Sequence, residues 1–183
     1  MATATTAIPT GTWTVDPAHS SIEFRVKHLG IATVKGRFTE FEGSLTIAED
    51  GSHHATGAIK VASVDTSEAA RDEHLRSPDF FDASTHPDIA FTSTALEVED
   101  DAVRVRGDIT IHGVTNPIEL EGTFGGSEVD PWGNQRVGLD ASGELSRGAF
   151  EMRFNQALGS GNMMVSDKVK IAVEISAVKA ASA

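Results

Sequence analysis

Cysteine and tyrosine are both missing from this sequence of 183 residues. Without cysteine the chain has no disulfide, no thiolate nucleophile, no iron–sulfur cluster and no cysteine zinc site. Its aromatic side chains are nine phenylalanines and two tryptophans. A phenylalanine ring offers a polar ligand no hydrogen bond, but it packs well along an alkyl or isoprenoid chain. The aromatic content therefore suits either a filled core or a site for an apolar ligand.

Basic side chains are also few, because 15 Lys and Arg stand against 27 Asp and Glu, for a formal net charge of −12. This balance argues against nucleic-acid binding and against docking on an anionic membrane by charge. No segment approaches the roughly 18 apolar residues of a membrane helix, and residues 1–9 show no signal-peptide pattern. We expect a cytoplasmic protein without stable membrane insertion.

The common catalytic motifs are absent as well. The sequence has no G-x-S-x-G elbow, no phosphate-binding glycine loop and no H-E-x-x-H pair. Seven histidines are scattered along the chain, and the adjacent pair His53-His54 would point to opposite sides of an extended backbone. A zinc site needs three or four convergent ligands. The sequence therefore predicts no metal site and no cofactor.

What the sequence does contain is alternation of apolar and polar residues, the pattern of a strand with one buried face. Ile22, Phe24 and Val26, for example, alternate with charged residues. The pattern predicts about eight strands, over 22–26, 34–47, 55–64, 89–97, 103–111, 118–124, 137–145 and 169–175. Glycines inside them are expected to mark bulges or bends, namely Gly36, Gly43, Gly107, Gly122 and Gly143.

Meander spacing favours one closed antiparallel barrel over a sandwich, and about eight strands enclose room for one small ligand. We expect a flexible segment over 1–10 and a single domain over 11–179.

The region 65–83 breaks the strand pattern. Asp65 followed by Glu68 predicts a capping box for a helix over 67–76, and Ser77-Pro78 predicts a second short turn. This turn carries Phe80 and Phe81, which would suit a lid near the barrel mouth. Within the helix, Arg71, Asp72 and His74 are either a solvated face with local ion pairs or a functional cluster.

Four blocks of sequence match a known family in order along nearly the whole chain. They are W-T-V-D-P-A-H-S-S-I-E-F at 13–24 with 26, 28 and 36–38; 64–66 with 71–82, 87 and 91; G-D-I-T-I-H-G-V-T at 107–115; and 138–150 with 165–169. The block R-D-E-H-L-R-S-P-D-F-F-D at 71–82 is the most specific. On these residues the chain resembles the YceI-like family of polyisoprenoid-binding, lipocalin-like barrels.

The resemblance implies an eight-stranded barrel with a helical segment near its mouth, an apolar tunnel for isoprenoid or fatty-acyl chains, no established catalysis, and frequently a homodimer. The predicted apolar lining is Ile22, Phe24, Val26, Phe38, Phe80, Phe81, Phe91, Val105, Phe150 and Met164. The predicted head-group contacts, which alternatively form a buried polar network, are His19, His28, Arg71, Asp72, His74 and Arg147.

The resulting hypothesis is a carrier or store for a long apolar lipid, and not an enzyme. One alternative is an enzyme acting on a prenyl diphosphate through Arg71, Asp72 and His74. The other is a stress-related interaction module whose barrel is filled with side chains.

Overall fold

The computed structural model of the chain describes residues 8–181. Strands form most of it, joined by one α-helix and three short 3-10 helices. In chain order the elements are β1 (Gly11–Val15), η1 (Pro17–His19), β2 (Ser21–His28), β3 (Ala32–Phe38), β4 (Phe41–Ile47), β5 (His53–Lys60), η2 (Val61–Ser63), β6 (Val64–Asp65), α1 (Ala69–Arg76), β7 (Asp88–Glu99), β8 (Ala102–Ile111), β9 (Val114–Val129), β10 (Gln135–Ser146), η3 (Gly148–Phe150) and β11 (Val165–Lys179).

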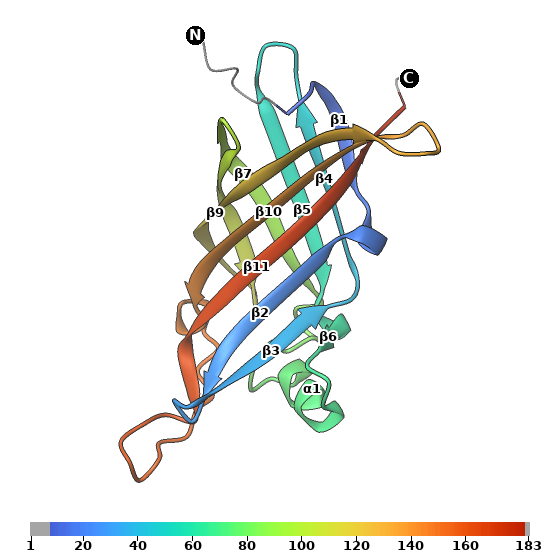
Figure 1. Cartoon of the computed structure of the whole chain (residues 1–183). Coiled ribbons are helices and arrows are strands. Elements are labelled where there is room, and N and C mark those ends of the chain that lie inside the picture. The colour runs from blue at the N-terminus through green and yellow to red at the C-terminus, as the bar shows by residue number, and fades with distance from the viewer. Residues whose placement is uncertain (1–7, 182–183) are drawn as a thin grey trace.

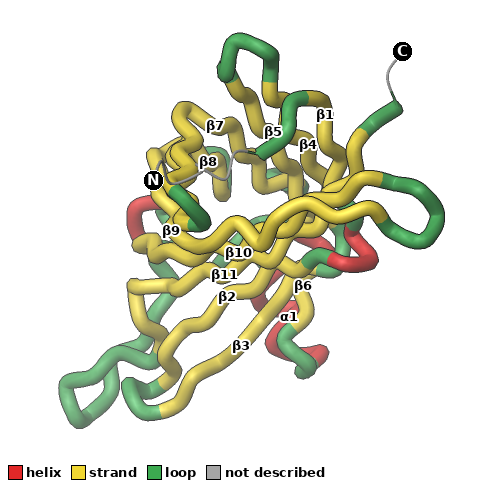
Figure 2. Tube along the Cα trace, turned by 45° about the horizontal axis from the view of Figure 1, so that its top comes forward, coloured by secondary structure: helices red, strands yellow, loops and turns green. Residues whose placement is uncertain are grey.

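The strands make one antiparallel sheet that closes on itself, because β1 pairs with β11 as well as with β4. Three of the barrel's strands are interrupted: β1 continues as β2, β3 as β4, and β5 as β6. Counted in this way, the labelled strands form the predicted eight-stranded antiparallel barrel. Figures 1 and 2 show the strands wrapping around a common axis, and in Figure 1 α1 lies at one end of the barrel and β1 at the other.

The break between β1 and β2 has a local cause at Pro17, which lacks an N–H and cannot continue the ladder. The Asp16 carboxylate caps the 3-10 turn that follows by accepting a hydrogen bond from the Ala18 amide at 3.0 Å. The ladder resumes at Ser21, and β2 then pairs with the N-terminal half of β11. Because of this break, β1 pairs with the C-terminal end of β11 and β2 pairs with the preceding part of the same strand.

The helix begins two residues later than predicted. Ser67 has a φ of 63°, in the left-handed region, so it cannot belong to a right-handed helix. Asp65 accepts from the Ser67 amide instead, and Glu68 is the actual N-cap, accepting from the amide of Arg71 at 2.6 Å. Within residues 8–181, no helix combines the length and the apolar character needed to cross a membrane.

The strand glycines have a further role besides the predicted bulges. Register shifts lie at 93–95, 138–139 and 165–169, and the first of them is opposite Gly107 on β8. Gly36 and Gly107 also make room for rings: an added Cβ would lie 2.2 Å from the Phe24 ring and 2.4 Å from the Phe91 ring, respectively. These glycines therefore let two large rings lie flat against the inner wall of the barrel.

A flexible segment was predicted over residues 1–10. Its first seven residues lie outside the described part of the chain, and residues 8–10 lie within it. Ile8, however, is buried with 6% exposure, and the Pro9 carbonyl accepts a hydrogen bond from the indole of the fully buried Trp13 at 3.0 Å. Ile8 and Pro9 therefore belong to the packed structure, because Ile8 and Trp13 lie in one buried cluster of the barrel.

Candidate functional site

The barrel interior contains a cavity of about 320 Å³. Its wall is made by the inward positions of the strands, as on β2, where Ile22, Phe24 and Val26 line it. The alternate residues Arg25 and Lys27 are exposed outside. Because side chains alternate between the two faces of a strand, every second residue of a wall strand points into the barrel.

Different segments close the two ends of the cavity. Ile8 and Trp13 lie at the end nearest the chain termini, in one buried cluster with Phe124. At the α1 end the lining includes Phe80 and Phe81, from the turn that follows the helix. The Phe81 ring packs edge-on against Phe38 with centroids 5.8 Å apart. The predicted second turn thus forms part of the cavity wall.

The three hydroxyl-bearing residues of the wall have partners within the barrel. The hydroxyls of Ser44 and Thr56 lie 3.2 Å apart, and Ser93 accepts from the Ala55 amide at 2.8 Å. A buried water needs two to four polar partners, so this interior holds ordered water poorly. The cavity is therefore suited to an apolar occupant.

Most of the predicted lining residues do face the cavity. Those that line it are Ile22, Phe24, Val26, Phe38, Phe80, Phe81, Phe91 and Val105. Phe150 and Met164 do not line it. Phe150 is 2% exposed and packs within the core cluster at the α1 end, while Met164 lies where the irregular loop 151–164 meets β11. Their positions follow from loop structure, which alternation does not predict.

Arg147 is the one predicted polar residue that reaches the cavity wall. It is 5% exposed and donates to four backbone carbonyls at 2.8–3.2 Å. The acceptors are Met152, Phe154, Val165 and Ser166. Burial lowers the pKa of Arg147, and the nearby Asp167 opposes this effect. Four of the five guanidinium N–H groups are thus occupied in holding the loop after η3 against β11.

Arg71 and Asp72 serve the start of α1. Asp72 is 7% exposed, and one of its carboxylate oxygens accepts from both the amide and the hydroxyl of Thr66, at 2.8 and 2.6 Å. The exposed Arg71 donates to the hydroxyl and carbonyl oxygens of Thr66 at 2.7 and 2.9 Å. Neither residue lines the cavity. Their contacts support the polar-network interpretation over direct contact with a head group.

His74 lies outside the cavity lining as well. Its Nε2 is 2.8 Å from the Asp79 carboxylate. The ring contacts Phe80 and Phe154 edge-on, at centroid distances of 5.0 and 4.9 Å. Arg147 lies 6.0 Å from the same Phe80 ring. The structure therefore brings His74 and Arg147 to one aromatic cluster behind the α1 end of the cavity.

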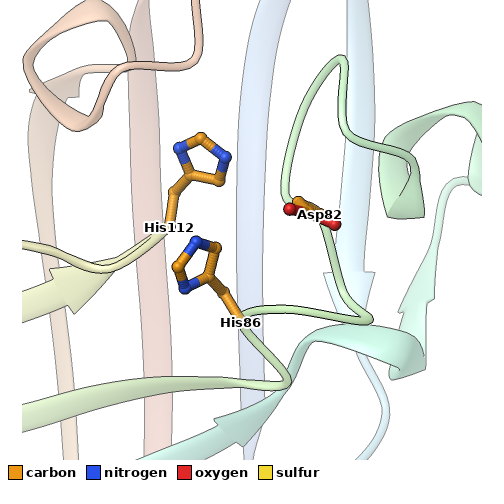
Figure 3. A group of neighbouring side chains, drawn as sticks. All are labelled: Asp82, His86 and His112. Atoms are coloured by element: carbon orange, nitrogen blue, oxygen red, sulfur yellow. The ribbon is translucent and has the colours of Figure 1, made fainter.

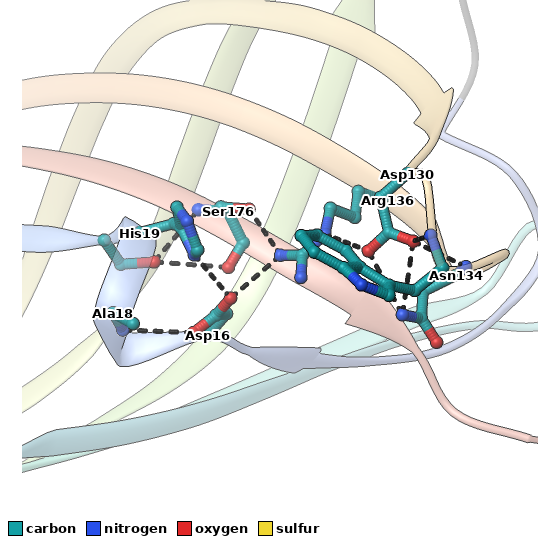
Figure 4. A network of polar contacts seen from close by, with 9 residues as sticks. Asp16, Ala18, His19, Asp130, Asn134, Arg136 and Ser176 are labelled. Carbon is teal, nitrogen blue, oxygen red and sulfur yellow. Dashed lines mark hydrogen bonds and ion pairs between the residues drawn. The ribbon is translucent and has the colours of Figure 1, made fainter.

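His19 and His28 are separated from that cluster. His28 is half-buried at the end of β2, and the exposed His19 pairs with Asp16 at 2.8 Å (Figure 4). Asp16 also accepts from Arg136 at 2.8 Å, and Arg136 bonds Asp130 at the same distance. The Arg136 and His19 side chains lower the pKa of Asp16 to about 2. This network ties the β1–β2 break to the β9–β10 hairpin.

Sequence reasoning missed the network around Arg136 because its central link joins Asp16 and Arg136, which are 120 positions apart. It also missed Asp82, His86 and His112, which converge outside the cavity. For these three residues the available signal was Gly113, because glycine is favoured at the second position of a two-residue hairpin turn.

Comparison with known proteins places this geometry in a family. The YceI-like domain model matches residues 13–177. A protein of Photorhabdus laumondii, UPF0312 protein plu2095, is 40% identical over 137 residues, which are 74% of this chain and 71% of that protein.

Two solved structures share the fold. The YceI protein of Campylobacter jejuni has a TM-score of 0.71 and 28% identity, over 85% of this chain and 90% of that chain. A polyisoprenoid binding domain from Saccharophagus degradans has a TM-score of 0.71 and 18% identity, over 92% and 98%. With a family model spanning most of the chain and a close relative at 40% identity, the barrel and its apolar cavity are those of a protein that belongs to the YceI-like family.

Proposed function

We propose that the protein binds a long apolar lipid, of the polyisoprenoid or fatty-acyl type, inside the barrel and serves to carry or store it. The observation that carries the proposal is the cavity of about 320 Å³ with an almost wholly apolar wall. An apolar cavity of about 150 Å³ already holds benzene, and pockets for small molecules start at about 300 Å³. The binding of polyisoprenoid by the Saccharophagus degradans domain of the same fold supports this ligand class.

Apolar burial supplies the driving force. Each methylene taken from water contributes roughly 0.8 kcal/mol, so a long chain needs few polar contacts. The remaining N–H of Arg147 is one candidate donor to a polar end of the ligand. Selection would then depend on chain length and shape, since the wall offers few other free polar groups among the described residues.

We also propose that binding is not accompanied by catalysis. Arg71, Asp72 and His74, the residues considered for diphosphate chemistry, lie outside the cavity lining and are engaged with Thr66 and Asp79. A general acid or base must come within hydrogen-bond reach of the reacting atom. The continuous cavity likewise favours binding over a barrel filled with side chains.

The first test is mass spectrometry of organic extracts from the purified protein, compared with a mock purification from the same cells. We expect one long-chain apolar species in amounts close to one per chain, because transfer of such a ligand from the apolar barrel into water is unfavourable. An extract that matches the mock purification, repeated after expression in the native host, would contradict the proposal.

Two variants test whether the lipid binds within the barrel. Phe24→Asp and Phe91→Asp put a carboxylate into the cavity wall, where an unpaired charge is strongly disfavoured, so the lipid content of folded protein should fall severalfold. Arg25→Asp and Thr92→Asp are the matched controls, since these neighbours on the same strands are exposed. Unchanged lipid in folded Phe24→Asp and Phe91→Asp protein would show that the lining is misassigned.

A homodimer and a cytoplasmic location remain predictions. Two exposed apolar side chains at the β9–β10 hairpin support self-association: Val129 is 58% exposed and Trp132 is 81% exposed. We expect light scattering on the purified protein to give twice the mass of one chain. A value equal to one chain at micromolar concentration would rule out the dimer, and Trp132→Ser would test this hairpin as the contact.

A further inference from the structure

Three side chains with metal-binding atoms converge outside the cavity, where the segment after α1 meets the β8–β9 hairpin. Asp82 and His86 come from that segment, and His112 comes from the two-residue turn between β8 and β9 (Figure 3). One ligand atom from each lies within 4.8 Å of the other two. All three residues are half-buried, and the two imidazole rings are 5.0 Å apart between centroids.

The backbone fixes the direction of these side chains. His112 and Gly113 have φ values of 54° and 75°, the left-handed pair of a tight hairpin turn. The Asp82 carbonyl accepts from the amide of His86 at 2.8 Å, which folds the 82–86 segment into a turn. The His86 ring lies directly over Gly113, since an added Cβ there would come within 2.7 Å of it.

The hydrogen bonds around the group prepare it for a cation. Nδ1 of His112 is 3.1 Å from the Phe150 carbonyl oxygen. A carbonyl only accepts, so Nδ1 is the donor, and in the neutral ring with this tautomer Nε2 is the nitrogen that can bind a metal. This histidine-to-carbonyl contact is the usual second shell of a metal-bound imidazole.

Asp82 is held in the same way. The Ser84 hydroxyl donates to its Oδ1 at 3.1 Å. The side chains of Thr85 and Ser84, together with the two nearby histidines, lower the pKa of Asp82. These contacts fix the Asp82 carboxylate beside the two histidines.

We propose that Asp82, His86 and His112 form a binding site for a divalent transition-metal ion of the zinc type. Two imidazoles and one carboxylate suit Zn²⁺ and its neighbours, whereas Mg²⁺ and Ca²⁺ prefer all-oxygen sites. Zinc bonds to nitrogen and oxygen are about 2.0–2.2 Å long, so the side chains need only a small inward rotation from their present spacing. Three protein ligands leave a fourth position for water.

Such an ion would clamp two parts of the fold. The 82–86 turn directly follows Phe80 and Phe81, which line the cavity, whereas His112 belongs to the turn that joins the wall strands β8 and β9. A metal shared between them would hold the closing segment against β8 and β9. Since the ion would bind the folded chain and not the unfolded one, it should also raise the thermal stability.

The test is a titration of EDTA-treated full-length protein with Co²⁺, followed by its visible absorption, and with Zn²⁺, followed by calorimetry. We expect one ion per chain and a rise in melting temperature with Zn²⁺. His86→Ala and His112→Asn should each weaken binding by at least about tenfold, since loss of even an outer-shell partner costs about that much. Asparagine is chosen at 112 because it accepts a positive φ.

His54→Ala is the matched control, because His54 is exposed on β5 and takes no part in the group. It should bind both metals like the unaltered protein. Circular dichroism would first establish that each variant is folded, and Asp82→Asn, which keeps the side-chain shape, provides a third variant. The proposal is overturned if the unaltered protein binds no Co²⁺, or if folded His86→Ala and His112→Asn bind it undiminished.

Discussion

Replacing Arg147 with methionine should lower the free energy of unfolding by on the order of 3–5 kcal/mol, as expected when the charged partner of a buried polar network is removed. The change leaves the carbonyls of Met152, Phe154, Val165 and Ser166 without their donor. Each unsatisfied buried acceptor costs about 1–3 kcal/mol, although entry of water into the loop recovers part of this. Urea unfolding monitored by circular dichroism measures the loss.

Two further variants separate the structural role of Arg147 from a ligand role. Arg153→Met is the control, since Arg153 is exposed in the same loop and should be neutral within about 0.5 kcal/mol. Arg147→Lys keeps the charge but lacks the planar fork, so it should recover only part of the stability. If Arg147→Met were as stable as the unaltered protein and had lost its lipid, Arg147 would be a head-group contact and not a loop clamp.

Removing the lipid should produce the second large effect, a fall in melting temperature of about 5–10 °C. A ligand present at 100 times its dissociation constant contributes about 2.7 kcal/mol, and about 1 kcal/mol corresponds to 2–4 °C for a chain of this size. Calorimetry before and after organic extraction and refolding measures the fall.

A variant with a filled cavity serves as the control for lipid removal. Val105 lines the cavity, and Val105→Trp adds a large ring to the interior. This variant should carry little lipid and should melt at the same temperature before and after extraction. If the extracted unaltered protein keeps its melting temperature, the lipid contributes nothing to the folded state, and the carrier proposal loses its energetic basis.

The fold could be predicted from sequence because each strand of the barrel wall has a local pattern of alternating apolar and polar residues. Apolar residues alternate with polar ones along each strand, and the pattern on β2 alone already separates Ile22 and Phe24 from Arg25 and Lys27. The same alternation predicted six of the residues that line the cavity, namely Ile22, Phe24, Val26, Phe38, Phe91 and Val105, because the inward face of a strand in a closed barrel points into the interior. It failed for Phe150 and Met164, which lie in segments without a repeating backbone.

The polar residues show the limit of this reasoning. A charged side chain in a motif is compatible with contacts to a ligand, to a neighbour or to the backbone, and its sequence neighbours do not distinguish these cases. Only the folded structure shows that Asp72 bonds Thr66 and that Arg147 holds four carbonyls. The capping of α1 was mispredicted for a related reason, because the left-handed φ of Ser67 favours Glu68 over Asp65 as the cap.

By itself the sequence determined the barrel class, most of its wall strands and the family to which the chain belongs, but not β1, the break between β3 and β4, or the 3-10 turn at Val61–Ser63. What it determined follows from local periodicity and from motifs that are contiguous in the chain. The tertiary structure alone decided which residues meet: Asp16 with Arg136, His74 with Phe154, and Asp82 and His86 with His112. Such contacts depend on strand register and loop path, which are set by the packing of the whole barrel and not by any single segment.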